Sequence, residues 1–176
     1  MEEGFAVWIT GLPASGKSTV AAALRKELAV RGVNVAVLES DELRKILTPE
    51  PRYDDAERDF FYGALAYMGL LLARHGVSVI IDATANRRAY RDRARKEIGR
   101  FLEVYVDSPL SVCIARDPKG IYRRGREGSS TGVPGLQAEY EPPLSPDVVV
   151  RGDAEEPSRA ACRIVAKLVE TGYVKE

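Results

Sequence analysis

The sequence predicts an α/β fold of three layers, in which a five-stranded parallel sheet is flanked by helices. Short apolar runs alternate along the chain with longer stretches of helical composition, as is typical of strand–helix–strand units. The third run is continuously apolar, as expected for a strand that is covered on both faces. With 176 residues and neither an internal repeat nor a linker, the chain is expected to form a single domain over residues 1–176.

Five predicted strands account for the sheet. The first ends at a glycine-rich segment, and the second and third end at acidic residues. The strands are residues 5–10 (FAVWIT), 34–39 (NVAVLE), 77–81 (VSVII), 101–106 (FLEVYV) and 147–151.

The predicted helices lie between and after these strands. Gly32 and Gly76 follow two of them, where glycine favours a helix end, and His75 is expected to interact with the second of these ends. Ser108 followed by Pro109 is a start signal, an N-cap before proline at the first helical position. The helices are residues 19–31, 41–47, 55–74, 87–98, 109 to about 116, and 156–170.

Residues 11–19 match the phosphate-binding P-loop, G-x-x-x-x-G-K-S, between the first strand and the first helix. The glycines let consecutive N–H groups point at a phosphate, and the helix N-terminus favours an anion. The lysine suits the β- and γ-phosphates of ATP, and the serine hydroxyl suits Mg²⁺. The residues are Gly11, Leu12, Pro13, Ala14, Ser15, Gly16, Lys17, Ser18 and Thr19. The sequence therefore predicts a P-loop NTPase or kinase fold.

Acidic residues follow the second and third strands, where ligands of parallel sheets bind. Glu39 and Asp41 follow one strand, and Asp82 follows the next. A carboxylate beside a P-loop can hold Mg²⁺ or accept the proton of an attacking hydroxyl. Asp41 is predicted to be the base and Asp82 to act with Ser18 at the metal. The alternatives are a helix N-cap for Asp41 and a strand-end turn for Asp82.

Residues 117–146 hold much glycine, proline and serine without a clear period, and such long irregular segments are usually functional. A mobile basic segment opposite a P-loop suits a phosphoryl-transfer lid, because it neutralises charge and excludes water. We therefore expect a lid over about residues 117–140, with a solvated loop as the alternative. Its basic residues are Arg116, Lys119, Arg123, Arg124 and Arg126. The second basic cluster, in helix 87–98, is expected to be mostly solvated, with Arg87 as the exception.

Composition excludes several classes of protein. Lys plus Arg and Asp plus Glu each number 26, so the net charge is zero, which disfavours a general nucleic-acid binder. No apolar run reaches the ~18 residues of a membrane span, and the acidic N-terminus lacks a secretory pattern. Cys113 and Cys162 are expected to be reduced core thiols, and one histidine with two cysteines predicts no zinc site. A cytoplasmic protein is expected.

Several motifs resemble those of the adenylylsulfate (APS) kinase family over nearly the whole chain. Residues 116–122 (RDPKGIY) resemble that family's R-D-P-K-G-L-Y lid signature, and residues 140–143 (YEPP) resemble the segment that follows it. The P-loop and residues 101–107 (FLEVYVD) also match. The resemblance implies transfer of the ATP γ-phosphate to the 3′-hydroxyl of APS, giving PAPS, with Mg²⁺, in a protein that is usually a homodimer.

The departures from the family pattern lie mainly on the acceptor side. The family's L-D-G-D-x-x-R is residues 38–44 (LESDELR) here, and Phe61 and Gly63 replace an asparagine and an arginine. Thr84 takes the place of a serine that is a possible phosphoacceptor. Residues 133–136 (VPGL) replace F-T-G-I, which removes an aromatic residue used against the adenine of APS.

The resemblance also assigns roles to residues of this chain. Lys17, Asp41 and Lys119 are the expected catalytic residues, and Arg116 joins the P-loop in binding ATP. The expected acceptor-binding residues are Asp41, Arg44, Tyr53, Arg58, Thr84, Arg87 and Lys119.

Two other functions remain open. One is a kinase of the same build with a different acceptor, such as another nucleotide conjugate or a polynucleotide end. Residues 82–87 (DATANR) resemble D-A-T-N-x-x-R of other small P-loop kinases, and residues 60–62 (FFY) suit either a less polar substrate or helix core. The other function is a nucleotide-dependent switch, which the basic lid and the base candidate disfavour.

Overall fold

A parallel five-stranded sheet forms the centre of the computed structural model, which describes residues 2–175. The strand order is β2-β3-β1-β4-β5, and every pairing is parallel. The strands are β1 (Ala6–Thr10), β2 (Val35–Glu39), β3 (Ser78–Asp82), β4 (Phe101–Asp107) and β5 (Val148–Arg151). The predicted fold class is confirmed, and each strand boundary lies within one residue of its prediction.

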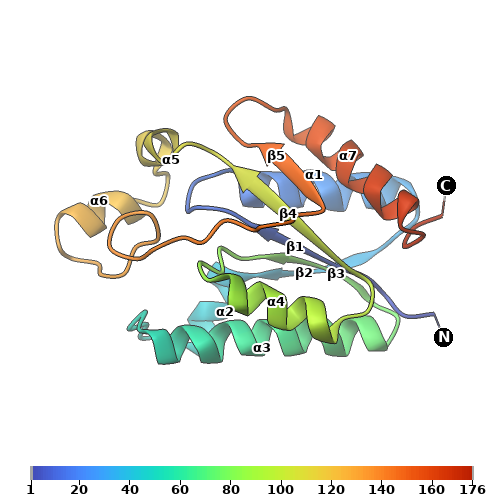
Figure 1. The fold of residues 1–176 in the computed structure, drawn as a ribbon, viewed down its shortest axis with the longest axis horizontal. Helices are drawn as coiled ribbons and strands as arrows, with labels where there is room; N and C mark the ends of the chain where they lie inside the picture. Colours follow the sequence, from blue (N-terminus) through green and yellow to red (C-terminus); the bar gives the residue numbers. More distant parts are fainter. Residues whose placement is uncertain (1, 176) are drawn as a thin grey trace.

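Helices cover both faces of the sheet (Figure 1). α1 and α7 lie together on one face, and α2, α3 and α4 lie on the other, while α5 and α6 extend beyond the sheet at its carboxyl edge. The helices are α1 (Lys17–Val30), α2 (Ser40–Leu47), α3 (Asp55–Arg74), α4 (Arg88–Glu97), α5 (Leu110–Arg116), α6 (Ile121–Arg126) and α7 (Pro157–Glu170).

The central strand β1 divides its side chains between two cores. Val7 and Ile9 pack with the helices α1 and α7, whereas Ala6 and Trp8 pack with α3 and α4. Successive side chains of a strand point to opposite faces, so one apolar run supplies both layers. Trp8 is fully buried, and its indole N–H donates to the carbonyl of Ala83 at 3.1 Å. This bond ties the centre of the sheet to the loop that follows β3.

The order of the strands positions the site. The neighbouring strands β1 and β3 are followed by helices on opposite faces of the sheet, α1 after β1 and α4 after β3. In open parallel sheets the crevice at such a switch point lies outside the carboxyl ends of the strands. The P-loop follows β1 at this point, and Glu39 and Asp82 end the two neighbouring strands in register with each other.

Helix α5 begins differently from the prediction. Ser108 is not its N-cap: α5 starts at Leu110, and Pro109 precedes it without a capping side chain. The Ser108 hydroxyl instead donates to the carbonyl of Ser15 at 2.9 Å, because β4 ends beside the P-loop. The segment after α5 also contains a helix that the sequence did not predict. Asp117 orders α6 by accepting hydrogen bonds from the N–H groups of Tyr122 and Arg123.

Three single residues test the predicted burial. His75 contacts the Leu71 carbonyl through Nδ1 at 2.8 Å, which confirms its position at a helix end. Cys113 is buried as predicted, but Cys162 is exposed on α7, because it lies on the face of that helix turned away from α1. Arg91 departs from the predicted solvated face of α4: it is 1% exposed and pairs with Glu103 at 2.7 Å.

Candidate active site

A cavity of about 870 Å³ lies at the carboxyl edge of the sheet. The P-loop forms its floor, and residues from the ends of β2 and β3, from α2 and from the segment around α5 and α6 complete its walls. Most of the residues expected to act on ATP or on the acceptor line this one cavity. Those on the acceptor side are Asp41, Arg44, Tyr53, Arg58, Thr84 and Lys119.

The P-loop has the backbone geometry that its glycines predict. At Gly11 a Cβ atom would lie 2.5 Å from the carbonyl of Val106, so a larger residue does not fit. Gly16 precedes α1 with φ of 106°, in the left-handed region that favours glycine. No acidic side chain lies in the first turn of α1. The helix N-terminus is therefore open to an anion.

Lys17 is the buried cation of this loop. Its side chain donates to the carbonyl of Leu12 at 2.8 Å, and the residue is 8% exposed. Burial lowers the pKa of Lys17, while the nearby charges of Asp82 and Asp41 oppose that shift. A bound polyphosphate would add the negative charge that favours the protonated amine. The position thus suits a phosphate ligand, as the sequence predicts.

Ser18 and Asp82 meet beside Lys17. The Ser18 hydroxyl donates to Asp82 Oδ2 at 2.6 Å, and Asp82 is 4% exposed at the end of β3. Residues 2–175 contain no group of three His, Cys, Asp or Glu side chains that would hold a metal by themselves. Mg²⁺ is commonly held by one or two protein oxygens together with substrate phosphates. This pair fits such a shared site.

Asp41 and Lys119 form an ion pair that joins α2 to the turn before α6. Asp41 lies in the first turn of α2, and both side chains are about half exposed. The hydrogen bond to Asp41 raises the pKa of Lys119 against a smaller effect of burial. The predicted base and the predicted lid cation are thereby brought together at the cavity.

The arginines of the acceptor side are held by contacts that the sequence did not reveal. Arg44 lies over the ring of Phe61, with 3.9 Å from Cζ to the ring centroid. Arg58 donates to the carbonyl of Gly132, in the segment that follows α6. Tyr53 has φ of 58°, and its N–H donates to Glu57 Oε2 at 2.8 Å, which holds this unusual conformation. Phe61 is fully buried and belongs to the helix core, whereas Tyr62 is buried but also lines the cavity.

Arg87 and Thr84, two residues that we expected on the acceptor side, differ in whether they line the cavity. Arg87 does not line the cavity, since its guanidinium pairs with Asp55 on the exposed side of α3 at 2.7 Å. Thr84 does line the cavity, and its carbonyl accepts a hydrogen bond from the Thr10 hydroxyl at 2.6 Å.

At Gly63, a Cβ atom would lie 2.7 Å from a guanidinium nitrogen of Arg93. Glycine at this departure from the family pattern therefore leaves space for the end of the flexible Arg93 side chain.

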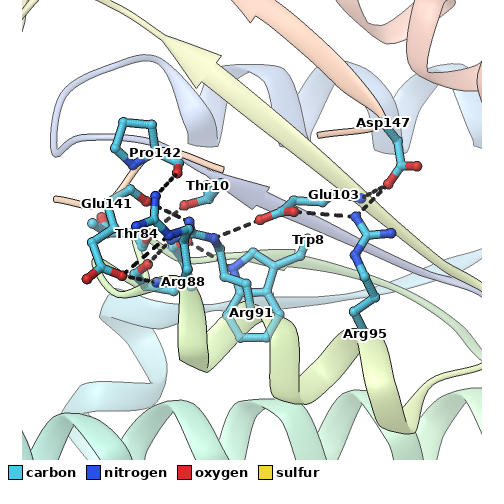
Figure 2. Close-up of polar contacts among 12 residues, drawn as sticks. Trp8, Thr10, Thr84, Arg88, Arg91, Arg95, Glu103, Glu141, Pro142 and Asp147 are labelled. Atoms are coloured by element: carbon cyan, nitrogen blue, oxygen red, sulfur yellow. Dashed lines mark hydrogen bonds and ion pairs between the residues drawn. The ribbon is translucent and has the colours of Figure 1, made fainter. Parts of the chain in front are cut away.

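Residues 139–143, which include the Y-E-P-P segment, are fastened to α4 and to the loop after β3 (Figure 2). The buried Arg91 donates to Glu103 at 2.7 Å and to the Glu141 carbonyl at 2.6 Å. The Tyr140 hydroxyl lies 3.0 Å from the Thr10 hydroxyl, and burial raises the pKa of Tyr140. Tyr140 therefore remains a neutral hydrogen-bonding group. The motif supports the cavity through the Tyr140 hydroxyl and through the carbonyl and carboxylate of Glu141, and it does not line the cavity.

One wall of the cavity was missed from the sequence. Gly152 and the residues up to Pro157, between β5 and α7, line the side next to the P-loop. At Gly152 a Cβ atom would lie 2.2 Å from the carbonyl of Ser15. No sequence motif marks this turn as part of the site. The one signal that could have indicated it is its position after a predicted strand, because ligands bind at the carboxyl ends of parallel strands. Arg116 lines the cavity as expected.

The fold and this site define a P-loop kinase. A family model described as adenylylsulphate kinase matches residues 3–151. The chain is 40% identical over 98% of its length to a probable adenylyl-sulfate kinase of Pyrococcus abyssi, of which it covers 99%. It is 38% identical over 99% of its length to an adenylyl-sulfate kinase of Microcystis aeruginosa, of which it covers 97%. The chain therefore belongs to the adenylylsulfate kinase family.

Solved structures agree with this membership. The Mycobacterium tuberculosis APS kinase CysC, solved in complex with AMPPNP and APS, superposes with a TM-score of 0.89 at 32% identity, covering 96% of this chain and 99% of that one. Shikimate kinase from Aquifex aeolicus shares the fold at 16% identity and a TM-score of 0.55. Within residues 2–175, no helix has the length and hydrophobicity to cross a membrane.

Proposed function

We propose that this protein transfers the γ-phosphate of ATP to the 3′-hydroxyl of APS, giving PAPS and ADP. The observation that carries the proposal is the meeting of Asp41 and Lys119 at a cavity floored by the P-loop. A pure nucleotide switch needs neither a base nor a lid cation. Membership in the adenylylsulfate kinase family supports APS as the acceptor.

ATP binds with its phosphates on residues 11–19. The backbone N–H groups and the amine of Lys17 balance the charge of the β- and γ-phosphates. Ser18 and Asp82 would hold Mg²⁺, which neutralises phosphate charge during transfer. Arg116 and residues 152–157 also line the cavity, and we assign them to the nucleotide.

The acceptor occupies the side formed by α2 and α3. Arg44 and Arg58 bind its anionic groups, and Tyr53 supplies an aromatic surface. Asp41 accepts the proton of the attacking 3′-hydroxyl or orients that hydroxyl toward the phosphate. Lys119 balances the charge that develops on the transferred group. The step forms one O–P bond and breaks another, and ADP leaves.

Residues 117–140 act as the lid of this single-domain enzyme. Lys119 pairs with Asp41, and the Gly132 carbonyl accepts from Arg58, so the segment touches both α2 and α3. Closure over the phosphates excludes water, which separates a kinase from an ATPase. Thr84 and Arg87 are assigned supporting roles at most, since the Thr84 backbone is bonded to Thr10 and Arg87 is paired with Asp55.

We further propose that the protein is a homodimer in the cytoplasm, where its ATP substrate is available. Phe60, Tyr67 and Leu71 are exposed on one face of α3, at the spacing of a helical stripe. Burial of this stripe against a second copy would remove apolar surface from water. The small-molecule partners of the protein are nucleotides, and the proposed reaction requires neither nucleic acid nor a membrane. Sedimentation equilibrium of the wild type and of Tyr67→Glu tests the dimer, and a monomeric wild type would exclude it.

The experiment that tests the function is ADP release by the purified protein with Mg-ATP and low micromolar APS. A panel of 5′-nucleotides and DNA or RNA ends runs beside it, and mass spectrometry identifies the phosphorylated product. Turnover with APS and formation of PAPS are expected. Turnover on another acceptor without any on APS would show that the scaffold serves a different substrate.

A further inference from the structure

The Arg44 guanidinium lies against three aromatic rings on the acceptor side of the cavity. Its Cζ atom is 3.9 Å from the ring centroid of Phe61, 5.0 Å from that of Tyr53 and 5.8 Å from that of Tyr62. A guanidinium within about 6 Å of a ring centroid is attracted to the ring face, more strongly where water is excluded. The side chain of Arg44 is 13% exposed, so water is largely excluded from this contact.

Polar contacts alone hold Arg44 less closely. Its Nη1 atom donates a long hydrogen bond to the Thr48 hydroxyl at 3.4 Å and lies 3.7 Å from Glu57 Oε2, beyond ordinary hydrogen-bond distance. The carboxylate of Glu57 already accepts from the backbone N–H groups of Arg52 at 2.9 Å and Tyr53 at 2.8 Å. Glu57 therefore supplies charge without fixing the plane of the guanidinium. The ring of Phe61 is the surface that can fix that plane.

Phe61 makes this contact from outside the cavity. The residue is fully buried on α3, in the core that packs against the sheet, and its ring meets that of Tyr62 edge-on at 5.4 Å. It stands where the family pattern has asparagine. A buried ring under Arg44 orients the charge without adding a polar atom that would need a partner of its own.

We propose that Phe61 is a positioning residue for the transfer to APS, in which its ring holds the Arg44 guanidinium ready to bind an anionic group of the acceptor. The inference rests on the proposed function, which places Arg44 at the acceptor. Phe61 acts through Arg44 and touches neither substrate. Replacing Phe61 by a residue without a ring should therefore weaken APS binding while leaving ATP binding unchanged.

The test compares Phe61→Leu with the wild type, measuring kcat and the KM values for APS and for ATP. Leucine keeps an apolar side chain but removes the ring face. The KM for APS should rise about tenfold, and the KM for ATP should stay within about twofold. If Phe61→Leu fails to fold, Phe61→Met, which also fills the space without a ring, takes its place under the same prediction.

Two control variants separate positioning from general loosening of α3. Phe101→Leu makes the same chemical change at a phenylalanine of β4 that is buried in the same core but does not line the cavity, and it should leave both KM values unchanged. Leu65→Ala removes buried volume one turn along the helix and should lower the melting temperature without an APS-specific effect. An APS-specific rise in Leu65→Ala equal to that in Phe61→Leu would overturn the proposal.

A double-mutant cycle with Arg44→Ala supplies the decisive readout. If Phe61 acts through Arg44, Phe61→Leu should have no further effect on the KM for APS once Arg44 is absent. If the effects of Phe61→Leu and Arg44→Ala on the KM for APS are additive, the role of Phe61 is overturned, while the proposed function still stands. A wild type that turns over no APS would overturn the proposed function and with it the inference, so the two failures are distinguished before any variant is made.

Discussion

Asp41 and Lys119 are 78 positions apart in the chain and form an ion pair at the edge of the cavity. Asp41 lies in the first turn of α2, and Lys119 lies in the turn between α5 and α6. The lid segment is thus connected to the residue proposed as the catalytic base. This relationship and the P-loop lead to three predictions, and the buried pair of Arg91 and Glu103 leads to a fourth.

Replacing Asp41 by asparagine should leave ATP binding intact and lower kcat by about 10²-fold or more, because the amide cannot accept the proton. Single-turnover rates and the dissociation constant for ATP are the measurements. Glu42→Gln is the matched control, since Glu42 is the exposed neighbour and pairs with Lys45. Near-normal turnover in Asp41→Asn would remove Asp41 from the role of base.

Lys17→Met should abolish ATP binding and stabilise the protein without ligand at neutral pH. Burial lowers the pKa of Lys17 below that of the unfolded chain, so folding at neutral pH carries the cost of a buried charge. As the pH rises from the lowered pKa toward 10.5, the unfolded chain binds more protons than the native state. The stability of the wild type should therefore increase relative to Lys17→Met across that window.

Denaturant unfolding of both proteins between pH 7 and pH 11 checks this direction. A difference in unfolding free energy that stays constant, or that changes in the opposite direction, would contradict the pKa assignment. Thermal shift with ATP then tests the ligand role, since ATP should raise the melting temperature of the wild type and not of Lys17→Met.

Ser18→Ala and Asp82→Asn should each raise the Mg²⁺ concentration needed for half-maximal activity. Ser18→Ala removes one oxygen ligand, and Asp82→Asn removes the negative charge, from the pair that meets at 2.6 Å. Activity is titrated with Mg²⁺ at fixed ATP. Ser40→Ala, a neighbour of the cavity with no assigned metal role, should leave the titration unchanged. An unaltered Mg²⁺ requirement in Asp82→Asn would exclude Asp82 from the metal site.

Arg91→Met should destabilise the protein by about 3 kcal/mol, because it leaves Glu103 buried with a weaker partner at 3.3 Å, Arg95. Arg93→Met is the control, since its pair with Asp59 is exposed and should be worth less than about 1 kcal/mol. Urea unfolding of both variants provides the comparison. Equal losses would show that the buried network in Figure 2 does not stabilise the fold.

The sequence predicted the strands and the P-loop well, because local pattern carries that information. The continuous apolar run of β3 predicts burial on both faces, and its residues are all buried. In residues 11–19, the positions of Gly11 and Gly16 likewise predict the backbone geometry of the loop. Helix α6 was missed, since its short sequence IYRRGR has no apolar period, and its start depends on the side chain of Asp117.

Long-range contacts account for the errors. Ser108 has the composition of an N-cap, but the end of β4 places it beside Ser15, where its hydroxyl finds a buried carbonyl. In the sequence, Arg91 is predicted to be exposed like the other arginines of its helix, yet packing of α4 on the sheet brings it to Glu103. In both cases a partner distant in the chain offers a better-shielded bond than the local alternative.

The sequence by itself determined the class of fold, the phosphate-binding loop and the carboxylates at the strand ends, since each depends on residue type and spacing along the chain. Tertiary structure alone decided which charges meet. It joined Lys119 to Asp41, placed Arg87 outside the cavity beside Asp55, and set Arg44 on the ring of Phe61. The physical reason is that pairing energies depend on distance and burial, and both arise when the helices pack against the sheet.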